Sequence, residues 1–292
     1  MHVAEVPAFG GPEVLQLAER PDPTPAPGEV VVRIGAANVN PTDLATRAGV
    51  HSPPGLALPY VPGWDFAGTV DGQRVVGMIP FGRIGGRVGA YAEAAAVDPA
   101  WLAPLPEGVD DVTASTLPLN ALTARQGLDL IAAPAGARIL VTGATGAVGG
   151  FATQLAARDG LRVVAVASTD DEDWVASLGA DEVLPRGTDL ARIGTVDAVF
   201  DGIPLGPEST ASLRDGGTAV FTRPPRAEPE RGMRFETVLV QPDPDMLRAL
   251  AEDLAAGRLR TRIAAMVPLA EASRAHALNE AGGLRGKVVL QP

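Results

Sequence analysis

The chain contains no cysteine, and its only histidines are His2, His51 and His276. Without cysteine the protein can form no disulfide bond, no catalytic thiolate and no cysteine-ligated zinc site. No two histidines have the short spacing that lets neighbouring imidazoles bind one metal ion, so a metal site would have to use carboxylates. We therefore predict a protein with neither disulfide bonds nor a bound metal.

Basic residues are scarce relative to acidic ones. The chain has 24 Lys and Arg residues against 35 Asp and Glu residues, a formal net charge of −11 and a pI of about 4.8. An acidic surface repels nucleic acid and anionic membranes, so we expect neither as a partner. Lysine occurs once, at Lys287, and we interpret that scarcity as a bias in composition without functional meaning.

Long hydrophobic runs are also missing. No uninterrupted apolar stretch reaches membrane-spanning length, and the first residues, MHVAEVPAFGG, lack the basic and apolar segments of a signal peptide. These absences predict a cytoplasmic protein. The hydrophobic share of 46% is enough for the core of one large domain or of two ordinary ones.

The first part of the chain, up to about Leu117, is rich in glycine and proline and contains short β-type runs. We expect strands at residues 29–34, 73–78 and 91–97, and a helix at residues 41–48. Short strands separated by turn residues are typical of an irregular all-β or barrel-like module.

A different pattern begins near Asp110, where apolar residues at helical spacing predict a helix over residues 110–132 with Asp110 or Asp111 as its N-cap. Strands built from Val, Ala and Ile then alternate with helices, which predicts a parallel sheet covered on both faces. The expected strands are residues 138–142, 162–167, 182–184, 198–201, 218–221 and 234–241, and the expected helices are residues 147–158, 171–178 and 207–213.

The last fifty residues do not continue this alternation. We expect a helix at residues 245–256, a strand at 263–267, a helix at 269–281 and a strand at 287–290. This tail either caps the parallel sheet or returns to the first module.

Glycines recur at a spacing of three between the strand at 138–142 and the helix at 147–158. The first two would let the backbone approach a pyrophosphate, and the third would let the helix lie near the sheet. The helix N-terminus would offer free N–H groups and the positive end of its dipole. The strand before and the helix after favour a dinucleotide site over a purely structural turn. The predicted pyrophosphate-binding residues are Gly143, Ala144, Thr145, Gly146, Ala147, Val148 and Gly149.

The end of the second strand distinguishes NAD from NADP. NAD sites place an acidic residue there, about 20 residues after the glycines, to bind the ribose hydroxyls. This chain has Ser168 and Thr169 instead, which favours NADP, and Arg186 after the next strand is the candidate counter-charge for a 2′-phosphate. Four acids follow Thr169 at once, and they either repel that phosphate or form a solvated helix N-terminus. These acids are Asp170, Asp171, Glu172 and Asp173.

Six short motifs occur in order along nearly the whole chain. They are NPTD at residues 40–43, PGWDFAG at 62–68, GAYAE at 89–93, GATGAVG at 143–149, LGAD at 178–181 and GKVVL at 286–290. Together they resemble the medium-chain dehydrogenase/reductase superfamily, in its zinc-free quinone oxidoreductase branch.

This resemblance implies an α/β fold with a GroES-like β-barrel catalytic domain, a Rossmann domain with a parallel sheet, and a C-terminal segment that returns to the catalytic domain. The implied catalytic domain covers residues 1–117 and 243–292, and the Rossmann domain covers residues 118–242. The resemblance also implies NADPH-dependent reduction of quinones, enones or similar activated alkenes. The implied assembly is a homodimer formed around the Rossmann edge strand between Thr237 and Gln241.

The resemblance also bears on zinc. Zinc-dependent relatives have Gly-His-Glu where this chain has Gly63, Trp64 and Asp65, so Trp64 stands at the place of a histidine ligand. A metal would polarise a carbonyl and acidify an alcohol; without it, hydride delivery to an electron-poor acceptor is better served than alcohol oxidation. We interpret Trp64 and Asp65 as structural, with Asp65 holding loop backbone.

The chain departs from the branch in three respects. The basic residue of the 2′-phosphate site falls at about Asp173, and Arg186 replaces an aromatic residue, where it could stack on the adenine and pair with the phosphate. Ala45 and His51 fall about where the branch has active-site tyrosines. The segment 69–74 is shorter than its counterpart, which trims one loop of the catalytic domain.

The remaining site residues have two interpretations each. Asn40 and Asp43 would line the nicotinamide end of the site, or they cap the helix that begins beside them. Thr123 matches a position that touches the nicotinamide, or it is an ordinary helix residue. Further cofactor-binding candidates at the carboxyl edge of the sheet are Phe221, Thr222 and Arg223.

His51 and Tyr60 are the candidates for contact with the acceptor. Histidine is the side-chain type that ordinarily changes charge near neutral pH, and His51 could protonate a nascent enolate or phenolate. The alternative is an exposed loop histidine. Quinone reduction needs no dedicated acid, because water can protonate the product.

Three functions stay open at this point. The leading one is an NADPH-dependent, zinc-independent reductase of quinones or α,β-unsaturated carbonyls. The second is an enoyl reductase acting on a carrier-bound or biosynthetic intermediate, which would need a long open channel where the first needs a compact cleft. The third is a non-catalytic nucleotide-binding redox sensor or scaffold, which the missing tyrosines and the acidic run favour.

Overall fold

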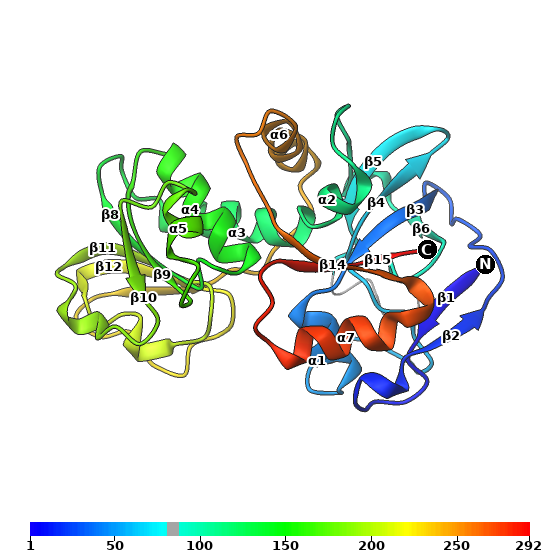
Figure 1. Ribbon diagram of the computed structural model, residues 1–292, viewed down its shortest axis with the longest axis horizontal. Coiled ribbons are helices and arrows are strands. Elements are labelled where there is room, and N and C mark those ends of the chain that lie inside the picture. The colour runs from blue at the N-terminus through cyan, green and yellow to red at the C-terminus, as the bar shows by residue number, and fades with distance from the viewer. Residues whose placement is uncertain (81–87) are drawn as a thin grey trace. The chain divides into compact units, whose positions relative to one another are not determined.

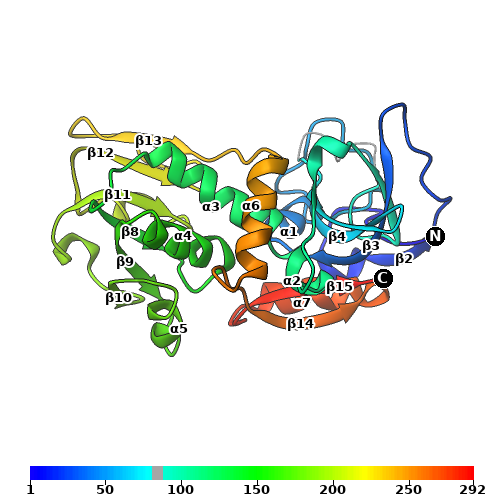
Figure 2. The same ribbon diagram turned by 90° about the horizontal axis from the view of Figure 1, so that it is seen from above.

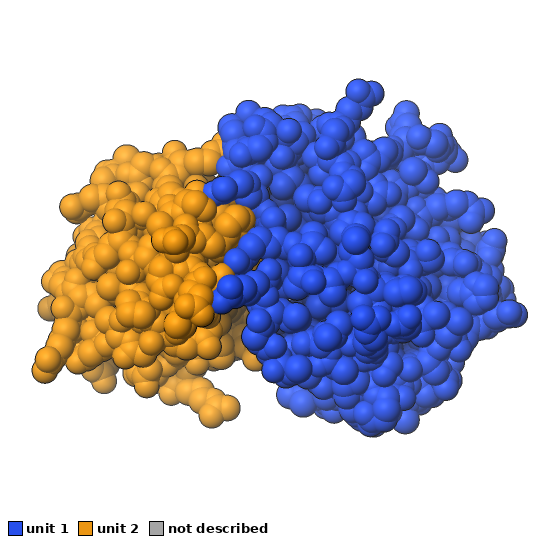
Figure 3. Space-filling view, viewed as in Figure 1, with its two compact units in different colours: residues 1–119, 241–292 blue, residues 120–240 orange. Residues whose placement is uncertain are grey.

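The computed structural model describes residues 1–80 and 88–292 of the chain. Contacts within the chain divide it into two compact units, coloured separately in Figure 3. Unit 1 consists of Met1–Leu119 with Gln241–Pro292, and unit 2 is Asn120–Val240.

Unit 1 is built on a seven-stranded, mostly antiparallel sheet (Figure 1). Its order is β14-β15-β3-β4-β5-β7, and β6 pairs with β3 off this path. Strands β1 and β2 form a separate, two-stranded sheet. The bounds are β1 His2–Glu5, β2 Gln16–Glu19, β3 Val30–Asn38, β4 Asp65–Val70, β5 Gln73–Met78, β6 Ala94–Val97, β7 Leu102–Pro104, β14 Ile263–Pro268 and β15 Lys287–Gln291.

The C-terminal tail returns to unit 1. Strand β15 pairs antiparallel with β3, with Val289 opposite Asn38, and parallel with β14. Helix α7, Ala272–Ala281, contacts α1, Pro41–Arg47, and both tail strands, as Figure 1 shows. The tail therefore returns to the first module and completes its sheet. Helix α6, Pro244–Ala255, and the 3₁₀ turn Leu269–Glu271 are its other elements.

The loop between β4 and β5 is as short as the sequence predicts. Only Asp71 and Gly72 connect the two strands, and both have positive φ angles, +48° and +81°. A two-residue turn with both central residues left-handed matches the twist of the strands that it joins. The core of unit 1 gathers Val, Phe and Tyr side chains from these strands, among them Val32, Phe66 and Tyr91.

Unit 2 contains the predicted parallel sheet. Its six strands have the order β10-β9-β8-β11-β12-β13, and all pairs are parallel. The strand order reverses between β8 and β11, which is the point where such sheets bind ligands beyond the carboxyl ends of their strands. The bounds are β8 Arg138–Thr142, β9 Arg162–Ala167, β10 Glu182–Pro185, β11 Val196–Asp201, β12 Leu213–Phe221 and β13 Arg234–Thr237 (Figure 2).

The helix expected over residues 110–132 is interrupted. The structure has α2, Asp111–Ser115, and α3, Pro118–Ile131, and Asp110 caps α2 by accepting a 2.8 Å hydrogen bond from the Thr113 N–H. Pro118 explains the break, because proline supplies no N–H and disfavours helical geometry at the residue before it. Helix α3 packs on the sheet where Gly127 leaves room for Phe200, whose ring would lie 2.5 Å from an added Cβ.

The prediction of a helix at residues 207–213 is wrong. Only a 3₁₀ turn, Gly206–Glu208, forms there, and Leu213 already pairs with Val196 as the first residue of β12. The hydroxyls of Ser209 and Thr210 bond back to the carbonyls of Gly206 and Pro207, a local alternative to helical hydrogen bonds. Where a helix was expected, apolar residues of connecting segments pack against side chains of the sheet. These residues are Leu190, Ile193, Leu205 and Met233.

The other helices of unit 2 follow the predicted order. They are α4 Ala147–Arg158 and α5 Glu172–Ala176, with a 3₁₀ turn at Leu190–Arg192. Two further 3₁₀ turns of unit 1 are Pro12–Val14 and Pro99–Trp101. In the part of the chain that the structure describes, no helix has the length and apolar character needed to cross a membrane.

Candidate functional site

In the glycine turn of unit 2, backbone segments approach one another closely, and the lack of a Cβ at its glycines makes this possible. Gly143 has a φ of +67°, and Gly146 is the N-cap of α4 and donates its N–H to the Gly143 carbonyl at 2.9 Å. A Cβ on Gly149 would lie 2.3 Å from the Gly143 carbonyl oxygen. The turn therefore brings the start of α4 against the end of β8, where the first N–H groups of the helix have no intrahelical partner.

Two hydrogen bonds join this turn to the end of β9. The Ala144 N–H donates to the Val166 carbonyl at 3.2 Å, and the Ser168 N–H donates to the Thr145 hydroxyl at 2.9 Å. Ala147 and Val148 form the first turn of α4. The residues predicted to bind pyrophosphate and those predicted to bind the ribose end are thus neighbours.

Arg186 and Ser168 meet at the end of β9. The guanidinium Nη2 donates a 2.7 Å hydrogen bond to Ser168 Oγ, and the Arg186 N–H donates to the Ala167 carbonyl at 2.8 Å. Arg186 and Thr169 are exposed, so a ligand can reach this corner. The pairing of hydroxyl and guanidinium offers hydrogen-bond donors and one positive charge to an anion.

The acidic run lies at the start of α5. Asp171 is buried and is the N-cap residue, and the first turn holds Glu172 and Asp173. Asp170 is exposed with a φ of +65°. Acids in a first helical turn offset the positive end of the dipole, which is the structural interpretation of this run.

Asp201, which the sequence did not single out, organises the adjacent strand end. Its carboxylate accepts hydrogen bonds from Thr142 Oγ1 at 2.5 Å, Ser209 Oγ at 3.0 Å and the Gly206 N–H at 3.2 Å. Burial raises the pKa of Asp201, and these hydrogen bonds oppose the rise. An acid at the end of a strand is too common in sequences to have signalled this role.

The predicted residues on β12 and beyond lie at the same edge. Phe221 is paired with Asp201 in the sheet and is buried, and the Thr222 N–H donates to the Asp201 carbonyl at 3.1 Å. Arg223 follows and is exposed. Thr123 is buried on α3.

Unit 1 contains a buried polar cluster formed by Asn38, Asn40, Asp43, Asp65 and Lys287. All are nearly inaccessible, with exposures between 0% and 8%. They come from β3, the start of α1, β4 and β15, segments that the tail brings together. Three ionisable groups in one buried cluster are unusual, because charges are costly to bury unless paired and hydrogen-bonded.

Asp65 is the acceptor at the centre of this cluster. Its Oδ2 accepts from the side-chain amides of Asn38 and Asn40, each at 3.0 Å, and its Oδ1 accepts from the Leu119 N–H at 2.9 Å. Lys287 Nζ donates to Asn40 Oδ1 at 2.9 Å. The Leu119 bond agrees with the interpretation of Asp65 as a residue that holds loop backbone.

Asp43 connects α1 to the PGWD loop. Its Oδ2 accepts from the Asn40 N–H at 2.9 Å and its Oδ1 from the Gly63 N–H at 3.1 Å. The side chain therefore caps the helix, as one of the two interpretations of this motif expects.

Burial dominates the electrostatics of the cluster. It raises the pKa of Asp43 to about 7 and that of Asp65 to about 6, although hydrogen bonds and Lys287 oppose both shifts. Burial also lowers the pKa of Lys287 to about 8, against the attraction of Asp65 and Asp43. Near neutral pH, Asp43 is therefore close to the midpoint of its titration.

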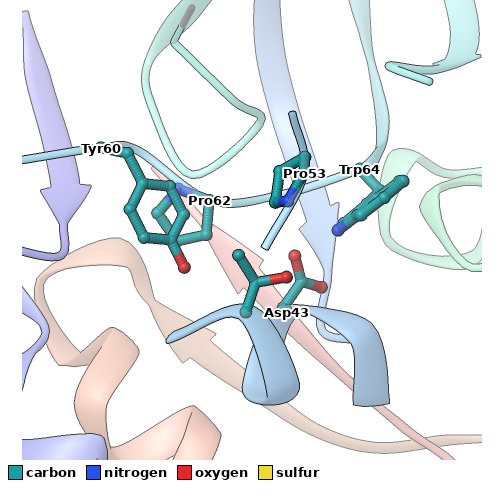
Figure 4. A pocket seen from close by; sticks show the side chains of 6 residues that line it. Asp43, Pro53, Tyr60, Pro62 and Trp64 are labelled. Atoms are coloured by element: carbon teal, nitrogen blue, oxygen red, sulfur yellow. The ribbon is translucent and has the colours of Figure 1, made fainter. Parts of the chain in front are cut away.

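A small pocket lies over Asp43. Its other lining residues are Thr46, Pro53, Tyr60, Pro62 and Trp64, and Figure 4 shows the Tyr60 ring directing its hydroxyl toward the helix that bears Asp43. Burial raises the pKa of Tyr60, so its hydroxyl keeps its proton. His51 is exposed in the loop after α1 and does not line this pocket.

The described residues offer no evident set of zinc ligands. Among residues 1–80 and 88–292, no three His, Cys, Asp or Glu side chains group as metal ligands would. The Trp64 indole has no lone-pair nitrogen to offer a metal. The buried histidine, His276, instead bonds the Tyr91 hydroxyl at 3.1 Å, and burial lowers its pKa to about 3.

The comparisons with known proteins agree with this geometry. Residues 26–107 match the family described as an alcohol dehydrogenase GroES-like domain, and residues 178–290 match the family described as a zinc-binding dehydrogenase. A quinone oxidoreductase of Lama guanicoe is 31% identical, covering 99% of this chain and 97% of that protein.

Two further relatives extend the comparison. A 2-methylene-furan-3-one reductase of Solanum lycopersicum is 30% identical, covering 97% of this chain and 77% of that protein. The solved structure of the quinone oxidoreductase from Coxiella burnetii has a TM-score of 0.89 at 28% identity, covering 100% of this chain and 99% of that one.

The chain belongs to the medium-chain dehydrogenase/reductase superfamily, with a GroES-like module and a Rossmann sheet. Within it, the protein is a quinone oxidoreductase-like member and an NAD(P)H-dependent oxidoreductase of the quinone and alkenal reductase type.

Proposed function

We propose that the protein is an NADPH-dependent, zinc-independent reductase of quinones or α,β-unsaturated carbonyls. The observation that carries the cofactor preference is the hydrogen bond between Arg186 and Ser168 beside the glycine turn. The names of the relatives, a quinone oxidoreductase and a 2-methylene-furan-3-one reductase, support the acceptor class.

The cofactor would be held along the carboxyl edge of the Rossmann sheet. The pyrophosphate would bind at Gly143–Gly149, and the 2′-phosphate would bind to Ser168, Thr169 and Arg186. Phe221, Thr222 and Arg223 would line the same edge. Thr123 would contact the nicotinamide. When bound, the cofactor supplies the hydride, while these residues bind and orient it.

Residues 1–117 and 243–292 would form the catalytic domain, and residues 118–242 the cofactor domain. Asn40 and Asp43 would position the nicotinamide end, and Tyr60 and His51 would contact the acceptor. A ring N–H of His51 could donate a proton to the product, which water can also protonate.

Zinc independence is supported by the donor set. The chain has no cysteine, and Trp64 replaces the histidine expected in zinc-dependent relatives. An acceptor that is already electron-poor needs no Lewis acid to accept a hydride.

The proposal includes a homodimer formed around β13 and the segment between Thr237 and Gln241. Strand β13 is at the edge of the sheet, and Leu239 exposes 77% of its surface. An unpaired edge strand offers N–H and C=O groups to a second chain.

Titration with NADPH and NADH, followed by an absorbance assay at the nicotinamide band, tests the proposal. The acceptor panel contains a quinone, an enone and an enoyl thioester. Tight NADPH binding with quinone or enone turnover is the expected result. Turnover of the thioester alone would favour the enoyl reductase, and nucleotide binding without turnover would favour a sensor or scaffold. Failure to bind either nucleotide would overturn every enzymatic interpretation.

A further inference from the structure

Unit 2 contains a hollow at the amino edge of its sheet, the edge opposite to the glycine turn. This amino-edge hollow lies between the end of α3 and the first residues of β11 and β12, and its volume is about 330 Å³. Small-molecule sites in proteins have volumes of about 300–1,000 Å³ and are mostly apolar, with a few polar groups. The apolar lining here consists of Ile131, Pro134 and four alanines, which are Ala132, Ala133, Ala137 and Ala198.

A bulge in β12 forms the polar side of the hollow. The register between β11 and β12 shifts between two pairs of partners, Val196 with Leu213 and Ala198 with Thr218. Residues 214–217 therefore stand opposite Asp197 alone, and such extra residues leave the ladder of strand hydrogen bonds. Within the bulge, the Gly216 N–H donates to the Arg231 carbonyl at 3.0 Å, and Arg231 Nη1 donates to Asp215 Oδ1 at 3.0 Å. These bonds fix the bulge, so the hollow is part of the folded structure.

The end of α3 fixes the apolar side. Ala132 follows the helix with a left-handed φ of +50° and donates its N–H to the Leu128 carbonyl at 3.0 Å. Arg234 on β13 donates from Nη2 to the Leu130 carbonyl at 2.8 Å. Glycine is the usual residue at such a helix end, so alanine accepts backbone strain there and adds a methyl group to the lining of the hollow.

Three polar side chains, Asp197, Arg214 and Thr218, line the hollow from the strands. Asp197 Oδ1 accepts a 3.1 Å hydrogen bond from Arg214 Nε, and Asp197 Oδ2 accepts from the Arg138 N–H at 2.9 Å. Arg214 Nη1 donates to the Asp215 carbonyl at 3.1 Å. Among the residues that the structure describes, Arg214 Nη2 and the Thr218 hydroxyl have no hydrogen-bond partner. The hollow therefore offers unused donors beside a carboxylate whose oxygens each retain a further lone pair.

The charges in the hollow favour a neutral ligand. Arg214 and Asp197 form an ion pair in which each side chain is partly exposed, so a ligand can reach both, and the other described lining residues are uncharged. An anion would be attracted by Arg214 and repelled by Asp197, and the reverse holds for a cation. A carboxamide suits both groups, because its oxygen accepts hydrogen bonds while its N–H donates one.

We propose that the amino-edge hollow binds a small neutral molecule with an amide edge on a compact apolar body. The amide oxygen accepts from Arg214 and Thr218, the amide N–H donates to Asp197, and the apolar body contacts the alanines. Asp197 and Asp201 are both on β11, roughly 13 Å apart at about 3.3 Å per residue. Asp201 lies at the carboxyl edge, so this site is separate from the proposed cofactor site and does not depend on the proposed function.

Benzamide, benzoate and benzamidine test the site, because they share one shape and are neutral, anionic and cationic at neutral pH. Isotope-labelled alanine methyl groups report in NMR spectra where each compound binds. Thr218→Val removes the hydroxyl donor, and Ala133→Leu places a larger side chain in the lining. Thr188→Val is the matched control, at a half-buried threonine of unit 2 that does not line the hollow. Melting temperatures verify that each variant is folded.

Benzamide should bind with a Kd of about 1 mM or tighter and should shift the methyl signals of the lining alanines. Benzoate and benzamidine should bind more weakly, since Asp197 repels the first and Arg214 the second. Thr218→Val should weaken benzamide binding roughly 2- to 12-fold and Ala133→Leu should abolish it, while Thr188→Val should leave it unchanged. Saturation with NADPH should not displace benzamide.

Failure of benzamide to shift the lining alanines overturns the assignment, and so does tighter binding of either ion. Shifts at Ala144 and Ala147 with displacement by NADPH would place the probe at the glycine turn and also overturn it. Equal benzamide affinity in the wild type and Thr218→Val would refute recognition of the amide edge. Binding at the lining alanines in a protein that binds no nucleotide would sustain this site and remove the proposed function.

Discussion

The ammonium group of Lys287 donates a 2.9 Å hydrogen bond to the side-chain oxygen of Asn40, 247 positions earlier in the chain. This contact joins the last strand to the first turn of α1 within the buried polar cluster. Lys287 also supplies the positive charge that Asp65 and Asp43 face. The only lysine of the chain is therefore a structural counter-ion.

Replacing Lys287 by Met should destabilise the protein strongly. The substitution removes the charged donor that bonds Asn40 and the positive charge that two buried carboxyl groups face, and losing a hydrogen bond to a charged group costs about 1.5–3 kcal/mol. Urea unfolding at pH 7 measures the loss. Arg192→Met is the control, since Arg192 is a cation whose side chain is 86% exposed, and its stability should stay near that of the wild type. Equal stability of the two variants would contradict the counter-ion role.

Stability should fall as pH rises through the titration of Asp43. Because its pKa is about 7 in the folded state, against an ordinary value of 3.8 for aspartate, the folded state keeps a proton that the unfolded state has released between these values. Between pH 5 and 7 the resulting loss is roughly 2 kcal/mol. Asp65 acts in the same direction, with a pKa of about 6.

The variant Asp43→Asn isolates this contribution, because asparagine does not titrate. Asp43→Asn also loses a hydrogen-bond acceptor, which lowers its stability at every pH. The test therefore compares how steeply stability changes with pH, and not the absolute stabilities. Urea midpoints at pH 5, 6 and 7 should show a steeper decline for the wild type than for Asp43→Asn. Parallel pH profiles would show that Asp43 is ionised throughout.

Gly149→Ala should abolish nucleotide binding. Its Cβ would lie 2.3 Å from the Gly143 carbonyl oxygen, so the turn would have to open. The neighbouring Gly150→Ala is a matched control, because its Cβ would come no closer than 3.3 Å, to the Ala144 carbonyl oxygen. Calorimetric titration with NADPH should show binding only in the control. Comparable affinity in both variants would argue against this pyrophosphate site.

Arg186→Ala should weaken NADPH binding roughly 10-fold or more while leaving NADH binding unchanged. If Arg186 binds the 2′-phosphate as proposed, the lost interaction is a charge-assisted hydrogen bond worth about 1.5–3 kcal/mol. Fluorescence titration with both nucleotides measures the selectivity, and Arg192→Ala serves as the control for the loss of one positive charge. Wild-type protein that prefers NADH would refute this role of Arg186.

Leu239→Asp should convert the proposed dimer to a monomer. A carboxylate at the edge beyond β13 would be desolvated in an interface and would meet its own copy across a twofold axis. Leu17→Asp places the same charge on β2 of unit 1, at a leucine that is 46% exposed, and it should remain dimeric. Light scattering after size-exclusion chromatography distinguishes the two, and a monomeric wild type would remove this part of the proposal.

The parallel sheet and the glycine turn were predictable because their signals are local. Val-rich strands and three-spaced glycines reflect burial on both faces and close backbone approach, and β8, α4 and β9 have the expected bounds. The absent helix at residues 207–213 was not predictable in this way. The pairing of Leu213 with Val196 and the hydroxyl bonds of Ser209 and Thr210 depend on tertiary position.

The buried polar cluster shows the same limit for the site. The NPTD motif identified Asn40 and Asp43 as site candidates. The single lysine, Lys287, was interpreted only as a result of biased composition. Its role depends on a strand pairing across nearly the whole chain, for which no short-range pattern exists. A lone lysine among many arginines, within a motif, was the one available signal.

The position of β15 between β14 and β3 sets an order on biosynthesis. Residues 120–240 are contiguous, so the ribosome can release everything unit 2 needs before unit 1 has its final strand. The sheet of unit 1 must wait for residues 287–291, and until then Asp43 and Asp65 lack their cation. A nascent chain halted before β15 would expose an open sheet edge, which is prone to aggregate until the closing strand is made.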